Sequence, residues 1–159
     1  MAPKEVASQF PSEGKEGEDS SPPHVTLVYI GNLPAKFEDR LKEVVKNVCD
    51  NFKSFGVKLG SPKKLVNDKG QKVFYSPVKS RRLALLHELF KAEFQRNQIP
   101  FSNKYPEFKP HITIEYVDPG CKRQYPELCP EGQWKIDSVW IWRRIRTLHV
   151  LFKISFLLF

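Results

Sequence analysis

The strongest constraint on the fold is a strand-type segment that occurs twice in the chain. Each copy reads Pro-His-apolar-Thr-apolar, as PHVTL at residues 23–27 and as PHITI at residues 110–114. Both copies run on into β-branched and aromatic residues and stop at turn-forming residues, a pattern typical of strands. Because the two histidines are 87 residues apart, the copies are not a local duplication. The sequence therefore predicts two matched strands, over residues 24–30 and 111–117.

The rest of the chain supplies helices and further strands. Apolar residues at helical spacing predict helices over residues 37–52 and 80–96. Ser80 is the expected N-cap of the second helix. The residues of this helix expected to face the core are Leu83, Leu86, Leu89, Phe90 and Phe94. A hairpin is expected where 64–66 and 72–75 flank the turn-rich residues 67–70.

The C-terminal part is read as two more strands, over residues 134–142 and 148–158, because apolar residues alternate there with a period of two. The predicted order is strand, helix, strands, helix, strand, strands. This order favours an α+β fold in which the helices pack against a sheet. The apolar end, residues 156–159, has a frayed tail as its alternative interpretation.

A length of 159 residues and a hydrophobic fraction of 40% fit one globular domain. We expect an irregular lead over residues 1–22, with a short helical turn near residues 4–10, and a single domain over 23–159. The N-terminus has no apolar signal segment, and the apolar run from Leu148 is shorter than the roughly 20 residues that span a bilayer. These features predict a cytoplasmic protein (in a host cell if the chain is viral) with no membrane partner.

The three cysteines, Cys49, Cys121 and Cys129, form no Cys-x-x-Cys pair and no zinc-type spacing. They favour a reducing compartment over a disulfide framework. A bridge between Cys121 and Cys129 is the less favoured alternative. No cluster of Asp and Glu resembles a two-metal site, so we expect neither a metal nor a cofactor.

The formal net charge is +8, from 26 Lys and Arg against 18 Asp and Glu. Such a balance favours polyanionic partners, nucleotides and nucleic acids first among them, with a generic basic surface as the alternative. Candidate base-stacking residues are Tyr75, Phe101, Tyr105, Trp140 and Trp142, although core packing competes as their role. Candidate phosphate-attracting residues are Arg81, Arg82, Lys109, Arg143, Arg144 and Arg146.

The repeated motif also carries chemistry. Residues i and i+2 of a strand point to the same face, so His24 and Thr26 share one surface and His111 and Thr113 share another. If the two strands lie close together, two imidazoles and two hydroxyls converge on one groove.

This set of groups suits phosphodiester chemistry. With an unperturbed pKa of about 6.5, histidine can serve as base in one copy and as acid in the other near neutral pH. Threonine hydroxyls can donate to the non-bridging oxygens of a phosphate. Either motif alone is better explained as an ordinary strand residue, but the pair favours a site. Which histidine is acid and which is base stays open, and the sequence identifies no substrate-binding residues beyond the four.

The pair HVTL and HITI resembles the signature of the 2H phosphoesterase superfamily, the LigT-like or 2′-5′ RNA ligase-like proteins. HVTLVYIGNL and FKPHITIEY are also similar to the contexts of the two family motifs, and the resemblance covers about residues 22–154. It implies a bilobal α+β fold, with antiparallel sheets lining a central groove and two main helices packed outside. By motif match it implies that His24 and His111 are the acid–base pair and that Thr26 and Thr113 bind phosphate.

The resemblance further implies a metal-independent phosphodiesterase acting on a nucleotide or a small, even cyclic, oligonucleotide. The lead-in and first motif are similar to phage-encoded members, among them the anti-CBASS nucleases that degrade cyclic nucleotide immune signals. Alternatives are an RNA 2′,3′-cyclic phosphodiesterase, a 2′-5′ RNA ligase-like enzyme, and a non-catalytic RNA- or nucleotide-binding module. The oligomeric state is not predicted.

Three further features bear on these predictions. Family members often have a strand before the first motif, whereas residues 1–22 make a poor strand. His87 and His149 lie outside the motifs and are expected to be surface or structural residues. Glu115 continues the alternation of His111 and Thr113, so it is expected on their face, either near the substrate or as a surface carboxylate.

Overall fold

The computed structural model describes residues 24–126, 132–144 and 147–155. The predicted irregular lead over 1–22, its helical turn near 4–10, and Pro23 lie outside these residues. So do Cys129, Arg146 and the predicted end of the last strand from Phe156 onwards.

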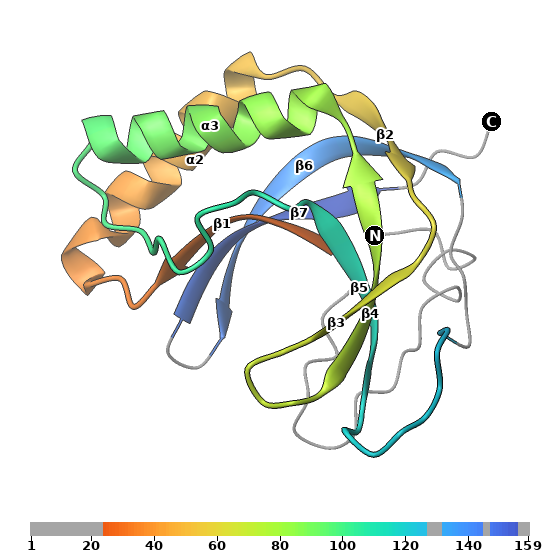
Figure 1. Cartoon of the computed structure of the whole chain (residues 1–159). Coiled ribbons are helices and arrows are strands. Elements are labelled where there is room, and N and C mark those ends of the chain that lie inside the picture. The colour runs from red at the N-terminus through yellow and green to blue at the C-terminus, as the bar shows by residue number, and fades with distance from the viewer. Residues whose placement is uncertain (1–23, 127–131, 145–146, 156–159) are drawn as a thin grey trace.

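The strands form a seven-stranded sheet in which every pair is antiparallel. Their order is β1-β7-β6-β2-β4-β3, and β5 also pairs with β4 (Figure 1). The strands are β1 (His24–Gly31), β2 (Phe55–Leu59), β3 (Lys63–Val66), β4 (Lys72–Lys79), β5 (His111–Val117), β6 (Gln133–Arg144) and β7 (Thr147–Ser155). The strands predicted over 24–30, 111–117 and 134–142 and the hairpin are confirmed, and the last predicted strand is confirmed as far as Ser155. Strand β4 pairs with β2, β3 and β5 and so joins the two antiparallel sheets that the family resemblance implied.

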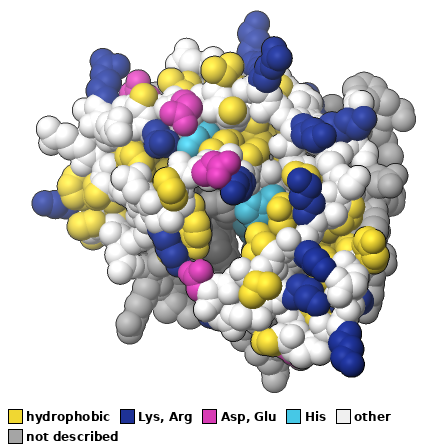
Figure 2. Space-filling view, in the orientation of Figure 1, with side chains coloured by type: hydrophobic (Ala, Val, Ile, Leu, Met, Phe, Trp, Pro, Cys, Tyr) yellow, Lys and Arg dark blue, Asp and Glu magenta, His cyan; other side chains and the backbone are white. Residues whose placement is uncertain are grey.

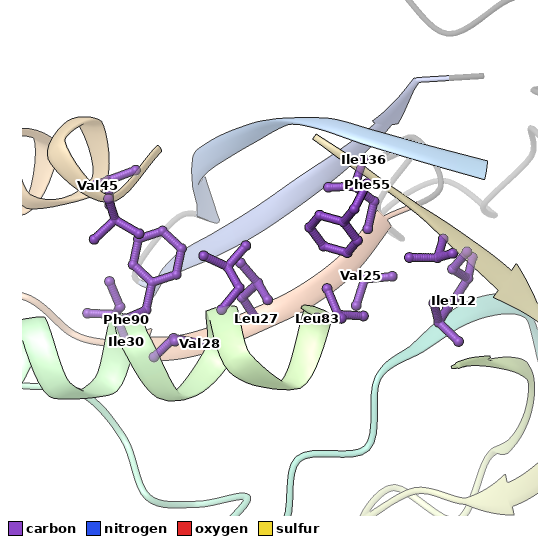
Figure 3. Packing of buried hydrophobic residues seen from close by; sticks show 14 of the residues in the cluster. Val25, Leu27, Val28, Ile30, Val45, Phe55, Leu83, Phe90, Ile112 and Ile136 are labelled. Carbon is purple, nitrogen blue, oxygen red and sulfur yellow. The ribbon is translucent and has the colours of Figure 1, made fainter. Parts of the chain in front are cut away.

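A short 3-10 turn, η1 (Ala35–Phe37), leads into α2 (Glu38–Asn51), and α3 (Arg81–Arg96) follows β4 directly. The two helices lie side by side over the sheet (Figure 1). Between them and the sheet is one apolar core, to which β1, α3 and β5 contribute Val25, Phe90 and Ile112 (Figure 3). The predicted α+β fold with antiparallel strands and two main helices is therefore confirmed.

The inner face of α3 differs from its prediction at two positions. Leu89 is 38% exposed, whereas His87 is only 9% exposed. At about 100° per residue, His87 lies about 40° from Leu83 on the helical wheel, and Leu89 lies about 120° away. The polarity of His87 suggested a surface position, but helical geometry places it among the buried residues.

Strand β4 continues past its predicted end at Tyr75, through Pro77 to Lys79. Proline cannot donate to a ladder, but Pro77 lies where β4 changes partners, from β3 before it to β2 after it. The Pro77 carbonyl accepts from the Gly60 amide at 2.7 Å. A Cβ atom at Gly60 would lie 2.9 Å from Pro77 Cγ, so a larger residue at position 60 would force Pro77 to shift.

Two serines near the end of β4 are expected to have opposite effects on stability when each is replaced by alanine. Ser76 is fully buried, and its Oγ has no hydrogen-bond partner in the described part of the chain. Ser80 Oγ caps α3 by accepting from the Leu83 amide at 3.3 Å. We expect Ser76→Ala to raise the free energy of unfolding by about 1 kcal/mol and Ser80→Ala to lower it by about 1 kcal/mol. Urea denaturation of both variants checks this, and a destabilising Ser76→Ala would contradict it.

Candidate active site

The two predicted motif strands are the strands whose edges face each other. Of the described strands, β1 pairs only with β7, and β5 pairs only with β4. The sheet curves so that β1 and β5 approach within 8 Å between Cα atoms, and both strands begin near the middle of the molecule (Figure 1). Val25 and Ile112, which directly follow the two motif histidines, pack into the same core (Figure 3). His24 and His111 therefore start neighbouring strands.

Within each motif the side chains alternate. Val25 and Leu27 are buried in β1, as are Ile112 and Ile114 in β5. His24, Thr26, His111 and Thr113, by contrast, are all partly exposed. Each strand thus anchors its motif with apolar side chains on one face and presents an imidazole and a hydroxyl on the other.

A β-bulge follows the threonine in both strands. In β1 the pairing passes from Thr26 to Val28, which leaves Leu27 as the extra residue. In β5 it passes from Thr113 to Glu115, which leaves Ile114 as the extra residue. A bulge interrupts the alternation and re-aims the side chains after it. The histidine and threonine are consequently the residues that each strand presents together before its direction changes.

The bulge in β5 changes the position expected for Glu115. Glu115 lies opposite Phe74 in the ladder and is not in phase with Thr113. Its carboxylate accepts from Arg123 Nη2 at 2.7 Å, and the Arg123 guanidinium lies 5.9 Å from the centre of the Phe74 ring. The prediction that Glu115 shares the face of His111 and Thr113 is therefore wrong, because it assumed an uninterrupted strand.

The His111 imidazole is oriented by backbone and aromatic contacts. Its Nδ1 lies 2.7 Å from the Lys109 carbonyl oxygen, which can only accept, so Nδ1 carries the hydrogen. In the neutral ring, Nε2 is then the nitrogen that carries no hydrogen. The Tyr75 ring meets the imidazole edge to face at 5.2 Å, and the Val78 amide donates to the Pro110 carbonyl at 2.8 Å. Strand β4 thus holds both the ring and the residue before it.

From α3, His87 contacts β1 and the segment that leads into β5. Its Nδ1 donates to the Leu27 carbonyl at 2.7 Å, at the bulge that follows Thr26. Its ring stacks on Phe108, three residues before His111, at 4.0 Å between centroids and 5° between planes. Of the two roles predicted for His87, surface or structural, the structural one is observed. Sequence reasoning did not link it to the motifs, although its place on the stripe between Leu83 and Phe90 was the available signal.

The burial of His87 gives stability a pH dependence. Burial is the main cause that lowers the pKa of His87, the Lys91 ammonium adds to the lowering, and the Leu27 hydrogen bond and the Glu88 carboxylate oppose it. The unfolded chain therefore binds this proton more readily, and stability is lost as the pH falls below about 6.5. We expect the free energy of unfolding of His87→Phe to fall less steeply as the pH is lowered. Urea denaturation between about pH 7.5 and 5.5 tests it, and identical slopes for the variant and the wild type would contradict it.

The other aromatic candidates lie in different surroundings. Tyr75 lies beside His111, whereas Phe101 packs against the core near Phe94. Tyr105 is 63% exposed, and its ring lies edge to face with that of Tyr29, with 6.0 Å between the ring centroids. The remaining predicted residues with side chains outside the described part are Trp140, Trp142, Arg143, Arg144, Arg146 and His149.

The basic candidates also differ in their contacts. Arg82 lies over the rings of Phe52 and Phe55, and Lys109 is paired with Glu107 at 2.8 Å. Of the described cysteines, Cys49 and Cys121 are both free thiols.

Figure 2 shows a hollow in the middle of this face, with a patch of histidine at its right-hand margin. A separate groove of about 730 Å³ lies between α2 and α3, among Arg40, Glu43, Glu93 and Arg96, and no motif residue lines it. Within the ranges that the structure describes, no three His, Cys, Asp or Glu side chains gather as a metal site. The same ranges contain no helix long and apolar enough to cross a membrane.

Comparisons with known proteins agree with this architecture. The sequence profile of the 2′-5′ RNA ligase superfamily matches residues 4–148. Among curated proteins none matches significantly. Among solved structures, TT0787 of Thermus thermophilus is similar with a TM-score of 0.60 at 13% identity, over 96% of this chain and 87% of that one.

Two further crystal structures, each 18% identical, are matched over 99% of this chain and 94% of their own. They are a phosphoesterase, with a TM-score of 0.57, and E. coli LigT complexed with 3′-AMP, with a TM-score of 0.52. At such identities the structures establish the fold alone. The profile match covers most of the chain, so the chain belongs to the 2′-5′ RNA ligase superfamily, and the predicted 2H phosphoesterase, LigT-like assignment is confirmed.

Proposed function

We propose that this protein is a metal-independent phosphodiesterase that acts on nucleotide-containing substrates, with His24 and His111 as general acid and base. The observation that carries the proposal is the approach of β1 and β5, the two edge strands that begin with these histidines. Membership of the superfamily adds phosphodiesterase or ligase chemistry as the expected class. The bound 3′-AMP named for E. coli LigT supports a nucleotide ligand.

The proposed reaction uses four side chains. One histidine takes the proton of the attacking hydroxyl or water as the new oxygen–phosphorus bond forms. The other, protonated, gives its proton to the leaving oxygen as the old bond breaks. Thr26 and Thr113 donate hydrogen bonds to the non-bridging oxygens, where the transition state holds negative charge. The two histidines exchange protonation states in each turnover.

The orientation of His111 favours such a role. With Nδ1–H held by the Lys109 carbonyl, its Nε2 faces away from the backbone and serves as acid or base according to its protonation. A histidine whose second nitrogen is fixed in this way keeps one tautomer through the cycle. The arrangement supports proton transfer better than simple phosphate binding, for which a lysine or arginine would suffice.

The substrate is identified by a panel containing 2′,5′-oligoadenylate, cyclic di- and trinucleotides, and 2′,3′-cyclic phosphates. We expect hydrolysis of at least one member, undiminished by EDTA, with products identified by mass spectrometry. Cleavage of the cyclic oligonucleotides would support a viral enzyme that degrades immune signals. Joined RNA would support a ligase, whereas binding without any turnover would support a non-catalytic module and overturn the proposal.

A further inference from the structure

The excess positive charge of the chain comes from one stretch of sequence. Residues 52–82, which we call the basic segment, contain seven lysines and two arginines but a single acid, Asp68, for a net charge of +8. The whole chain also has a net charge of +8, so its other residues balance. The basic segment comprises β2, β3, β4 and the start of α3. The charge is therefore concentrated on neighbouring strands.

The basic side chains of this segment have no acidic partners within the described ranges. The lysines and arginines that form ion pairs there all lie elsewhere: Lys42, Lys46, Lys91, Arg96, Lys104, Lys109 and Arg123. Even Asp68, the acid of the basic segment, pairs with Lys104 from outside it, at 3.0 Å. Uncompensated charges on adjacent strands produce a positive potential that attracts anions.

The strand register connects three of these lysines to the motif of β5. Lys63 lies opposite Tyr75, which in turn lies opposite Thr113, and directly opposed residues share a face of the sheet. Tyr75 and Lys79 also share a face, because they are four residues apart in one strand, and Lys58 lies opposite Lys79. Lys58, Lys63 and Lys79 are all exposed. They therefore lie on the face that presents Thr113, and we call them the flanking lysines.

The surface has the same arrangement. In Figure 2 the hollow has Lys and Arg side chains along its right-hand side, where Figure 1 places β2, β3 and β4. The acidic side chains that are clearly visible lie mainly on the opposite side. Two strand spacings, roughly 10 Å, separate β3 from β5. Anionic groups beyond the reacting phosphate would meet these lysines first.

We propose that the flanking lysines hold the phosphates next to the reacting one in a single-stranded oligonucleotide, with a base stacked on Tyr75. The row Thr113, Tyr75, Lys63 presents a hydroxyl, an aromatic ring and an ammonium in sequence, which matches a phosphate, a base and a further phosphate. The inference rests on the proposed function for the identity of the reacting phosphate. It favours substrates with several phosphodiesters over mononucleotides.

The test is the binding of a labelled single-stranded oligoribonucleotide of about eight nucleotides and of a dinucleotide, followed by fluorescence anisotropy at several salt concentrations. The variant is Lys58→Gln, Lys63→Gln, Lys79→Gln in the full chain. The matched control removes the same number of charges at Lys36, Lys42 and Lys46, which lie on η1 and α2. We expect the first variant to lose about 10- to 100-fold in affinity for the longer strand, with a salt slope lower by about two. We expect a smaller loss for the dinucleotide and little loss in the control.

Equal losses in both variants would reduce the effect to net charge and overturn the inference, as would an unchanged affinity in the first variant. Binding is measured without turnover, so the two proposals fail separately. Lysine-dependent binding with no hydrolysis of any panel member would contradict the proposed phosphodiesterase activity and support the binding surface. Hydrolysis of short substrates together with lysine-independent binding would support the phosphodiesterase and contradict the binding surface.

Discussion

His24→Ala and His111→Ala are each expected to lower the turnover of the phosphodiester substrate by about 10²- to 10⁴-fold, the usual contribution of a positioned acid or base. Both side chains are only partly buried and stand at the first residue of a strand, so their removal leaves the core packing intact. The loss should therefore appear in kcat with little change in unfolding temperature. Turnover at a fixed pH and circular dichroism during heating measure the two effects separately.

A sharper readout for these variants is rescue by added imidazole, which can supply a mobile acid or base in place of the deleted ring. We expect partial recovery of turnover in either alanine variant and none in the wild type. Full activity in one variant without imidazole would remove that histidine from the mechanism. Loss of activity together with loss of the folded state would assign it to structure, so the unfolding measurement decides between these outcomes.

The strands that carry the site could be predicted from local sequence. The period of two at 24–30 and 111–117 predicts both strands and the shared face of each His and Thr, and the exposure of these four side chains follows that pattern. The N-cap at Ser80 is also a local feature, because it needs only a hydroxyl one residue before a helix. Such features depend on a few consecutive residues.

The supports of the site depend instead on residues distant in sequence. The bulge at Ile114 arises from the pairing of β5 with β4, so the strand's own residues do not reveal that Glu115 leaves the alternation. The contact of His87 with Leu27 joins residues 60 positions apart and requires the packing of α3 on β1. The apolar period of α3 predicted most of its inner face, with Leu89 as the exception. It did not predict that His87, a polar residue of that face, contacts β1 and the segment before β5.

The motif threonines provide the second large effect. Thr26→Val and Thr113→Val replace a hydroxyl with a methyl of nearly the same shape and keep the β-branched side chain that a strand favours. If the hydroxyls donate to the non-bridging oxygens, each substitution should lower kcat by about 10²- to 10³-fold, as loss of an oxyanion donor does. The matched variants Thr26→Ser and Thr113→Ser keep the donor and should retain most of the turnover.

The pattern across these four variants separates catalysis from packing. Serine lacks the methyl group, so a packing role would make the serine variants the more damaged pair and leave the valine variants active. A donor role predicts the reverse order, because only valine removes the hydroxyl. In both strands one extra residue follows the threonine, so we expect the two motifs to respond alike. A large loss at one threonine with none at the other would show that the phosphate is held from one strand only.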